Sequence, residues 1–236
     1  MNKTEVMKKL KAAGNESARK TYARHGVTGD AFGVHYADLY KLQQQIGSDQ
    51  KLAEQLWATG NHDARILATL ILEPAKMKAS TLEQWVKTVT SQISLDAVAV
   101  TAGKSPSAVS CMKKWIKSKQ EWIAATGWHV LTVLANRDNS LTDKQFSGYI
   151  DHIEENIHSS PNRVRHSMNQ AVISIGVRNT ALQEKALAAA TRIGKIKVDH
   201  GDTSCKTPDA AAYIKKTIAH RKRKDAKAAA TKRSKA

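Results

Sequence analysis

Apolar residues recur along most of the chain with the period of an α-helix. In the clearest stretch the spacing i, i+3, i+4, i+7, i+8 is filled by Ala64, Leu67, Ala68, Ile71 and Leu72. Nearly the same spacing returns in 82–93, 146–157 and 164–175. We find no stretch that alternates apolar and polar residues as a half-buried strand does. The pattern therefore predicts an all-α protein.

Helix starts are marked by hydroxyl residues and proline. The pairs Ser105-Pro106, Ser160-Pro161 and Thr207-Pro208 have the order of an N-cap followed by the first helical residue. Ser80 with Glu83 and Thr142 with Gln145 match the capping box. The predicted helices cover 3–13, 16–25, 35–46, 49–59, 62–73, 81–92, 95–103, 106–118, 120–136, 143–157, 161–176, 180–196 and 208–220.

Short polar connections join these helices into two-helix units of about 40 residues, which is near the period of HEAT and armadillo repeats. Stacked pairs bury one apolar stripe against the next pair and leave a long curved surface. We therefore expect residues 1–220 to form one domain, an α-solenoid of HEAT-like repeats with a concave basic groove. An irregular helical bundle is the alternative, and periodicity alone does not separate the two.

Composition supports a folded chain and excludes several classes. Of the 236 residues, 41% are hydrophobic and 25% are charged, which is typical of a globular protein with a core. Two cysteines, Cys111 and Cys205, are too few for a disulfide framework or a cysteine-rich zinc module. No apolar run is long enough to span a membrane, and Met1–Lys11 lacks the core of a signal peptide, so we expect a cytoplasmic protein without membrane contact. No Walker A, GxGxxG or GxSxG pattern occurs, and no cofactor is predicted.

Charge points to a polyanionic partner. Lys and Arg number 38 against 21 Asp and Glu, a formal charge of +17. The tail 221–236 has eight basic residues and one Asp without apolar periodicity, so we expect a basic disordered tail, or else an extension of the last helix. The body 1–220 still carries +10, which favours nucleic acid as the partner, with a merely solvated basic surface as the alternative.

Several motifs resemble those of a known family. They are Phe32-Gly33-Val34 followed by Leu39, then Leu56-Trp57, Asp63-Ala64-Arg65, and Leu82 through Val98. Over most of 20–200 the chain resembles the DNA alkylation repair family of AlkD-like DNA glycosylases, which are built from HEAT-like repeats. The resemblance implies a groove that holds duplex DNA and excises positively charged alkylpurines, with tryptophans and one carboxylate at the lesion. We also expect a monomer.

The catalytic segment of the family is only partly kept. Where the family has W-D-x-x-D, this chain reads Leu95-Asp96-Ala97-Val98-Ala99. The resemblance therefore leaves Asp96 as the candidate catalytic carboxylate, which would stabilise an oxocarbenium-like transition state. A helix cap is the alternative role for this residue. Trp128 is the candidate for an aromatic wall of the groove.

Two basic clusters are candidates for DNA contact. Arg163, Arg165 and His166 lie near the start of the helix that Pro161 opens, where free N–H groups and the helix dipole favour phosphate; a solvated helix end is the alternative. Lys113 and Lys114, beside Trp115, form a second cluster suited to the DNA backbone. The segment Asp199–Cys205 holds residue types that bind metals but no metal-binding motif, so we expect a turn and no metal site.

Taken together, these features predict a DNA-binding helical-repeat protein of DNA alkylation repair. Whether it excises bases is left open at this point. A basic scaffold for nucleic acid or for an acidic protein partner is the alternative. An RNA-associated or ribosome-associated protein is a third interpretation, which the tail alone supports.

Overall fold

The computed structural model describes residues 1–137 and 141–233, and in these ranges the chain is helical without strands. Its α-helices are α1 (Lys3–Ala12), α2 (Glu16–Arg24), α3 (Tyr36–Ile46), α4 (Gln50–Trp57), α5 (His62–Ile71), α6 (Ala79–Val86), α7 (Gln92–Gly103), α8 (Ala108–Trp115), α9 (Glu121–Ala135), α10 (Asp143–Asn156), α11 (Asn162–Gly176), α12 (Thr180–Ile193) and α13 (Ala210–Arg233). A short 3₁₀ helix, Pro74–Lys76, follows α5. The predicted fold class is confirmed, and every predicted helix has its counterpart in the same order.

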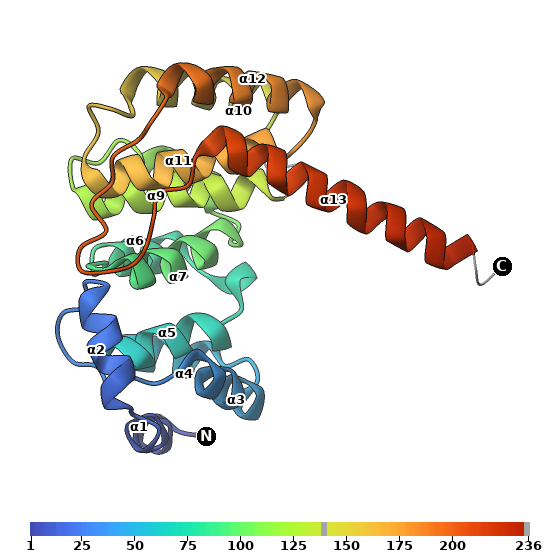
Figure 1. Cartoon of the computed structure of the whole chain (residues 1–236). Coiled ribbons are helices and arrows are strands. Elements are labelled where there is room, and N and C mark those ends of the chain that lie inside the picture. Colours follow the sequence, from blue (N-terminus) through green and yellow to red (C-terminus); the bar gives the residue numbers. More distant parts are fainter. Residues whose placement is uncertain (138–140, 234–236) are drawn as a thin grey trace.

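The helices stack as pairs in two layers (Figure 1). We call the first helix of each pair the A helix and the second the B helix. The A helices are α4, α6, α8, α10 and α12, and the B helices are α5, α7, α9, α11 and α13. Successive B helices pack side by side from α5 to α13, so they form a continuous layer, whose outward surface we call the B face. This is the stacking expected of a HEAT-like solenoid.

Local sequence explains most helix starts. The Thr142–Gln145 capping box is present: Thr142 Oγ1 accepts from the Gln145 backbone N–H (3.2 Å), and Gln145 Oε1 accepts from the Thr142 N–H (2.9 Å). The Ser80–Glu83 box is wrong, because α6 begins earlier, at Ala79, and the Glu83 carboxylate instead accepts from the Trp115 indole N–H at 2.8 Å. The helix predicted over 81–92 ends at Val86, since Ser91 caps α7.

The three Ser/Thr–Pro pairs lie just outside their helices. The helices that follow them begin at Ala108, Asn162 and Ala210, one or two residues later than predicted. For α13 the cap is Asp209, whose Oδ1 accepts from the Ala212 N–H at 2.8 Å. The prolines therefore lead the chain into these helices without being their first residues.

The Phe32-Gly33-Val34 motif is held by one buried carboxylate. Asp63, at the start of α5 and 0% exposed, accepts the backbone N–H groups of Phe32 (2.6 Å), Gly33 (3.1 Å) and Val34 (2.7 Å). Gly33 has a φ of +79°, and a Cβ there would lie 2.4 Å from the carbonyl oxygen of Asn15. Only glycine fits this turn, and the Asp63 interaction fastens the N-terminal helices to the stack.

Arginines connect the ends of successive B helices. Arg137 Nη1 donates to the Gly103 carbonyl at the end of α7 (2.6 Å), and Arg178 Nη1 donates to the Ala135 carbonyl at the end of α9 (2.5 Å). Arg221 on α13 donates in the same way to the Val177 carbonyl after α11 (2.5 Å). We call these three residues the arginine ladder. Each cation lies at the negative end of a helix dipole and satisfies a carbonyl that the helix itself leaves unpaired.

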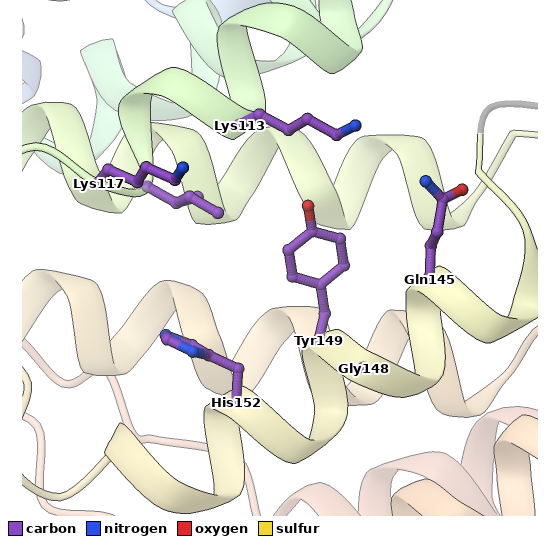
Figure 2. A pocket seen from close by; sticks show the side chains of 7 residues that line it. Lys113, Lys117, Gln145, Gly148, Tyr149 and His152 are labelled. Atoms are coloured by element: carbon purple, nitrogen blue, oxygen red, sulfur yellow. The ribbon is translucent and has the colours of Figure 1, made fainter.

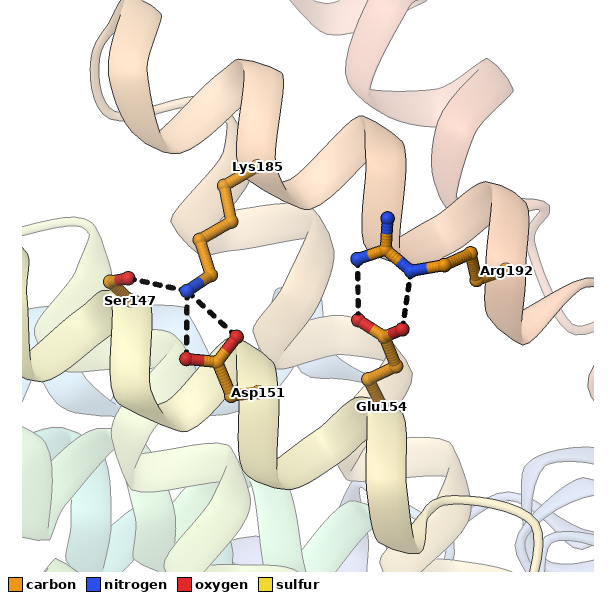
Figure 3. Close-up of polar contacts among 5 residues, drawn as sticks. All are labelled: Ser147, Asp151, Glu154, Lys185 and Arg192. Atoms are coloured by element: carbon orange, nitrogen blue, oxygen red, sulfur yellow. Dashed lines mark hydrogen bonds and ion pairs between the residues drawn. The ribbon is translucent and has the colours of Figure 1, made fainter.

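Charged pairs also join the A helices α10 and α12 (Figure 3). Lys185 Nζ donates to Asp151 and Ser147, each at 2.7 Å. Arg192 forms a two-point contact with Glu154, including one N–O distance of 2.8 Å. This end of the A layer is therefore closed by ion pairs that bridge its neighbouring helices.

After α12, the segment 194–209 runs past α11 toward α2 and returns to start α13 (Figure 1). Helix α13 packs on α11 and α12 through Ile214 and then projects away from the stack. Of the two alternatives for 221–236, a disordered tail or an extension of the last helix, the structure has the extension, with α13 continuing through Arg233; residues 234–236 lie outside the described part. The alanines of this segment explain the difference, because alanine has the highest helix propensity.

Candidate nucleic-acid interface

A row of polar side chains crosses the B face. Asp96 on α7 lies opposite His129 on α9, with 3.5 Å between Asp96 Oδ1 and His129 Nδ1. His166 on α11 continues the row, and its ring contacts that of His200, from the segment 194–209, at 5.5 Å between centroids. Four side chains from three stacked helices and one connecting segment thus line up on the B face. We call them the polar row.

Helix geometry decides which residue of α7 belongs to this row. Leu95, Val98, Ala99 and Ala102 are fully buried in the core, whereas Asp96 keeps about half of its side chain exposed. Gln92, one turn earlier, donates its amide N–H to Asp96 Oδ1 at 2.7 Å. The Ala99 position therefore faces the core, and a carboxylate there would not reach the B face. Nor does Asp96 cap the helix, because Ser91 fills that role.

Burial shapes the charge of the row. It raises the pKa of Asp96, against the opposing effects of His129 and of the Gln92 hydrogen bond. Burial also lowers the pKa of His129 and lowers that of His166 to about 4, with the charges of His200, His129 and Arg163 adding to the latter shift. The imidazoles of His129 and His166 are therefore neutral at pH 7. Their Nδ1 atoms are buried and have no hydrogen-bond partner among the described residues.

Aromatic side chains border the row at α3. Tyr36 and Tyr40 are 39% and 50% exposed, and their ring centroids lie 6.2 Å apart. Tyr36, Asp96 and Val100 line a shared pocket of about 380 Å³. Burial, with smaller effects from Tyr22, Asp96 and Tyr40, raises the pKa of Tyr36 to about 12, so its hydroxyl stays protonated. Exposed tyrosine rings of this kind are able to stack on bases.

Of the predicted phosphate clamp, the structure brings Arg163 and His166 to the row. Arg163 lies near His166 and His200, and its guanidinium sits 5.6 Å above the Trp122 ring. Arg165 has a different role, since it donates to the carbonyls of Lys197 (2.6 Å) and Ser160 (2.9 Å). Its fork of donors holds the segment 194–209 in place.

The other predicted DNA contacts lie elsewhere. Lys113 and Lys114 are on α8 in the A layer, where Lys114 pairs with Glu83 at 2.8 Å. Trp128 is 1% exposed and stacks on His152 of α10 at 5.5 Å, so its indole offers no wall to a base. Because Trp128 points into the core, its neighbour His129 is the residue of α9 that reaches the B face.

Sequence reasoning missed His129, His200 and Tyr36. His129 directly follows the candidate Trp128, so this part of α9 already offered a signal. His200 gave none, because its place depends on the path of a long connecting segment. The predicted turn there is present: Asp199 Oδ1 accepts from the Gly201 N–H at 2.8 Å.

The structure gathers no three potential metal ligands anywhere in 1–137 or 141–233. No helix in the same ranges is long and apolar enough to cross a membrane.

A stack of helix pairs of this kind defines a HEAT-like repeat protein. The family model described as DNA alkylation repair enzyme matches residues 6–222, and the chain belongs to this family. The resemblance drawn from its motifs is thereby confirmed.

Relatives of known sequence or structure extend over almost the whole chain. Lin0241, an uncharacterised protein of Listeria innocua serovar 6a, is 30% identical over 214 residues, covering 88% of this chain and 93% of its own. The uncharacterised Lmo0209 of Listeria monocytogenes serovar 1/2a is 29% identical over the same share. A solved structure with a TM-score of 0.85 and 30% identity covers 93% of this chain and 95% of its own. It is described as representing a new family of proteins related to the HEAT-like repeat DNA glycosylases with affinity for branched DNA structures.

Proposed function

We propose that this protein binds DNA on its B face, favours branched over linear duplexes, and does not excise bases. The observation that carries the proposal is the likeness to the solved relative with affinity for branched DNA, which extends over 93% of this chain. The family model, which matches residues 6–222, includes every helix that bears the polar row.

Charge supports the same partner. The chain has a formal charge of +17, and Arg163 adds a cation at the α11 end of the polar row. Helix α13 adds further cations where it leaves the stack. Phosphate contacts of this kind position DNA without reading its sequence.

The surroundings of Asp96 favour binding without base excision. A carboxylate that stabilises an oxocarbenium ion must be charged and free to face the sugar. Here the Gln92 amide occupies Asp96 Oδ1, His129 Nδ1 lies 3.5 Å from the same atom, and burial raises the pKa of the carboxyl group. Trp128, the expected aromatic wall, is buried. The remaining carboxylate is therefore part of the row and poorly placed for catalysis.

Fluorescence anisotropy with a four-way junction and a linear duplex of the same strands tests the binding part. We expect the junction to bind at least about tenfold more tightly, a difference of about 1.4 kcal/mol. Arg163→Glu on the B face should weaken junction binding by about tenfold or more. Lys113→Glu in the A layer reverses a positive charge in the same way and is the matched control. Its junction affinity should stay within about twofold of that of the unchanged protein. Equal effects of the two substitutions would refute the B face as the interface.

Release of 7-methylguanine from duplex DNA, with protein in excess over substrate, tests the catalytic part. We expect no release above the uncatalysed background from either the unchanged protein or Asp96→Asn. Release that the substitution abolishes would instead establish a glycosylase that uses Asp96. If neither DNA form binds at low salt, the alternative of a basic scaffold for an acidic protein takes the place of this proposal.

A further inference from the structure

A second pocket lies in the A layer, between α8 and α10 (Figure 2). Its volume is about 590 Å³, within the range of sites that hold small molecules. The residues that line it are Lys113, Ile116, Lys117, Gln145, Gly148, Tyr149 and His152. The DNA site proposed above lies in the B layer, so this pocket is separate from it.

The two walls of the pocket differ in character. One wall has Lys113, on α8, and Lys117, two residues after that helix ends, and neither forms an ion pair with any described residue. From α10 come an amide, a phenol and an imidazole, with no carboxylate among the lining residues. The neighbouring helices α10 and α12 are joined by the Lys185–Asp151 and Arg192–Glu154 ion pairs. Between α8 and α10 no such acidic partner meets the lysines, so their charge is unmatched.

The Tyr149 and His152 rings of the pocket are held in place because Trp128 packs against them from the core. The buried indole stacks on the His152 ring at 5.5 Å with an interplanar angle of 21°. It also meets the Tyr149 ring edge-on, at 6.1 Å and 88°. Both rings are thereby held in one orientation before any ligand arrives, which lowers the entropy cost of binding. Burial raises the pKa of Tyr149, so its hydroxyl remains a hydrogen-bond donor.

Gln145 is fixed by the start of α10. Its Oε1 accepts from the Thr142 backbone N–H at 2.9 Å in the capping box. The oxygen is therefore committed to the cap, and Figure 2 shows the amide nitrogen on the side of the pocket. Next to Tyr149, Gly148 leaves open space, since a Cβ at this position meets no atom within 4 Å.

We propose that this pocket binds a small ligand of nucleotide size that combines a planar ring with a phosphate group. The two unpaired lysines match the phosphate, because an ammonium group binds phosphate as a point charge. The Tyr149 and His152 rings and the Ile116 side chain offer a surface for the planar part. This inference goes beyond DNA binding, and the two sites can be occupied together because they lie on different layers.

Gly148→Leu separates the shape of the pocket from its charge. The leucine side chain fills the open space beside Tyr149, while every lysine stays in place. Leucine also has a higher helix propensity than glycine, so the variant should fold at least as well as the unchanged protein. Lys113→Met combined with Lys117→Met does the converse, removing charge and keeping the shape. Lys144→Met, on α10 outside the pocket, controls for the loss of a lysine.

Adenosine monophosphate, adenosine and inorganic phosphate are the probes, measured by saturation-transfer NMR and calorimetry with the full chain. We expect the monophosphate to bind at least about tenfold more tightly than either fragment. Gly148→Leu and the double lysine variant should each weaken it by about tenfold or more, and Lys144→Met by less than about twofold. The melting temperature and junction binding of Gly148→Leu should match those of the unchanged protein.

Two results would overturn the inference. One is the absence of monophosphate binding to the unchanged protein, or binding that Gly148→Leu leaves intact. The other is a loss of junction binding in Gly148→Leu without a change in melting temperature, which would make the pocket part of the DNA interface. Because junction binding is measured alongside, failure of this inference is distinguishable from failure of the proposed DNA-binding function.

Discussion

Deleting residues 222–236 tests whether the projecting part of α13 contacts DNA. At 100° per residue, Lys215, Lys216, Lys222, Arg223 and Lys227 fall within about 140° of arc. Ile214 and Ile218, which pack on the stack, lie on the other side of the helix. One face of α13 therefore presents a continuous basic stripe. Cutting after Arg221 keeps its contact with the Val177 carbonyl, so the arginine ladder stays complete.

The deletion removes seven Lys and Arg residues, of which Lys222, Arg223 and Lys227 belong to this stripe. Each neutralised phosphate contributes about 0.9 to the slope of log K against log salt concentration, so the slope should fall by roughly 2.7 if all three contact phosphate. Between about 50 and 200 mM salt, a slope difference of that size corresponds to roughly 40-fold in affinity. We expect residual binding from the B face, because +10 of the formal charge belongs to residues 1–220.

Anisotropy titrations of a junction at four or more salt concentrations measure the slope. Replacing Lys222, Arg223 and Lys227 by glutamine should reproduce the effect without shortening the helix. The matched control replaces Lys51, Lys87 and Lys144, which are exposed and lie on or next to A helices, by glutamine. An unchanged slope after deletion would show that the stripe does not contact DNA. Loss of all binding would show that the B face contributes nothing.

Four further outcomes are expected. Asp63→Ala leaves three buried backbone N–H groups without their acceptor and should lower the unfolding free energy, measured by urea denaturation, by at least about 3 kcal/mol. The control Asp49→Ala removes an ordinary N-cap and should lower it by about 1 kcal/mol. Similar values for the two variants would contradict the role of Asp63. The pKa of His166, about 4 when folded and about 6.5 when unfolded, means that the unfolded chain binds the proton more tightly. Stability should therefore fall between about pH 6.5 and 4 by roughly 3 kcal/mol at most, and less in His166→Asn, as thermal unfolding at several pH values would show. Arg163→Ala should weaken DNA binding similarly for different DNA sequences, and a large change in sequence preference would reject a phosphate contact by this residue. Arg165→Ala should speed proteolysis within 194–209, because it removes the hydrogen bond to the Lys197 carbonyl.

Sequence patterns predicted the helices because each apolar stripe reports its own burial. The capping box at Thr142 was predictable because all its parts lie within four residues of one another. At Ser80 the same pattern misled, because Glu83 is drawn to Trp115 and Lys114 on a helix far along the chain. Local signals fail where a distant partner competes for the same side chain.

The candidate interface was only partly predictable. Asp96 was found through a motif, but its orientation followed from the buried positions of α7, which place Ala99 in the core. Lys113 and Arg163 both belong to basic clusters, and the sequence does not say that they lie in different layers. His200 reaches His166 only through the path of a sixteen-residue connection, 194–209, that has no periodic pattern to read.

The arginine ladder bears on how such a chain could grow or shrink during evolution. Its members are spaced by about one repeat, and each satisfies a carbonyl of the preceding unit, never one of its own helix. A whole repeat inserted or removed in frame would bring or take away one arginine together with one carbonyl partner. The polar bonding between units would stay balanced at every length, so duplication of a helix pair would not leave an unpaired group at the new junction.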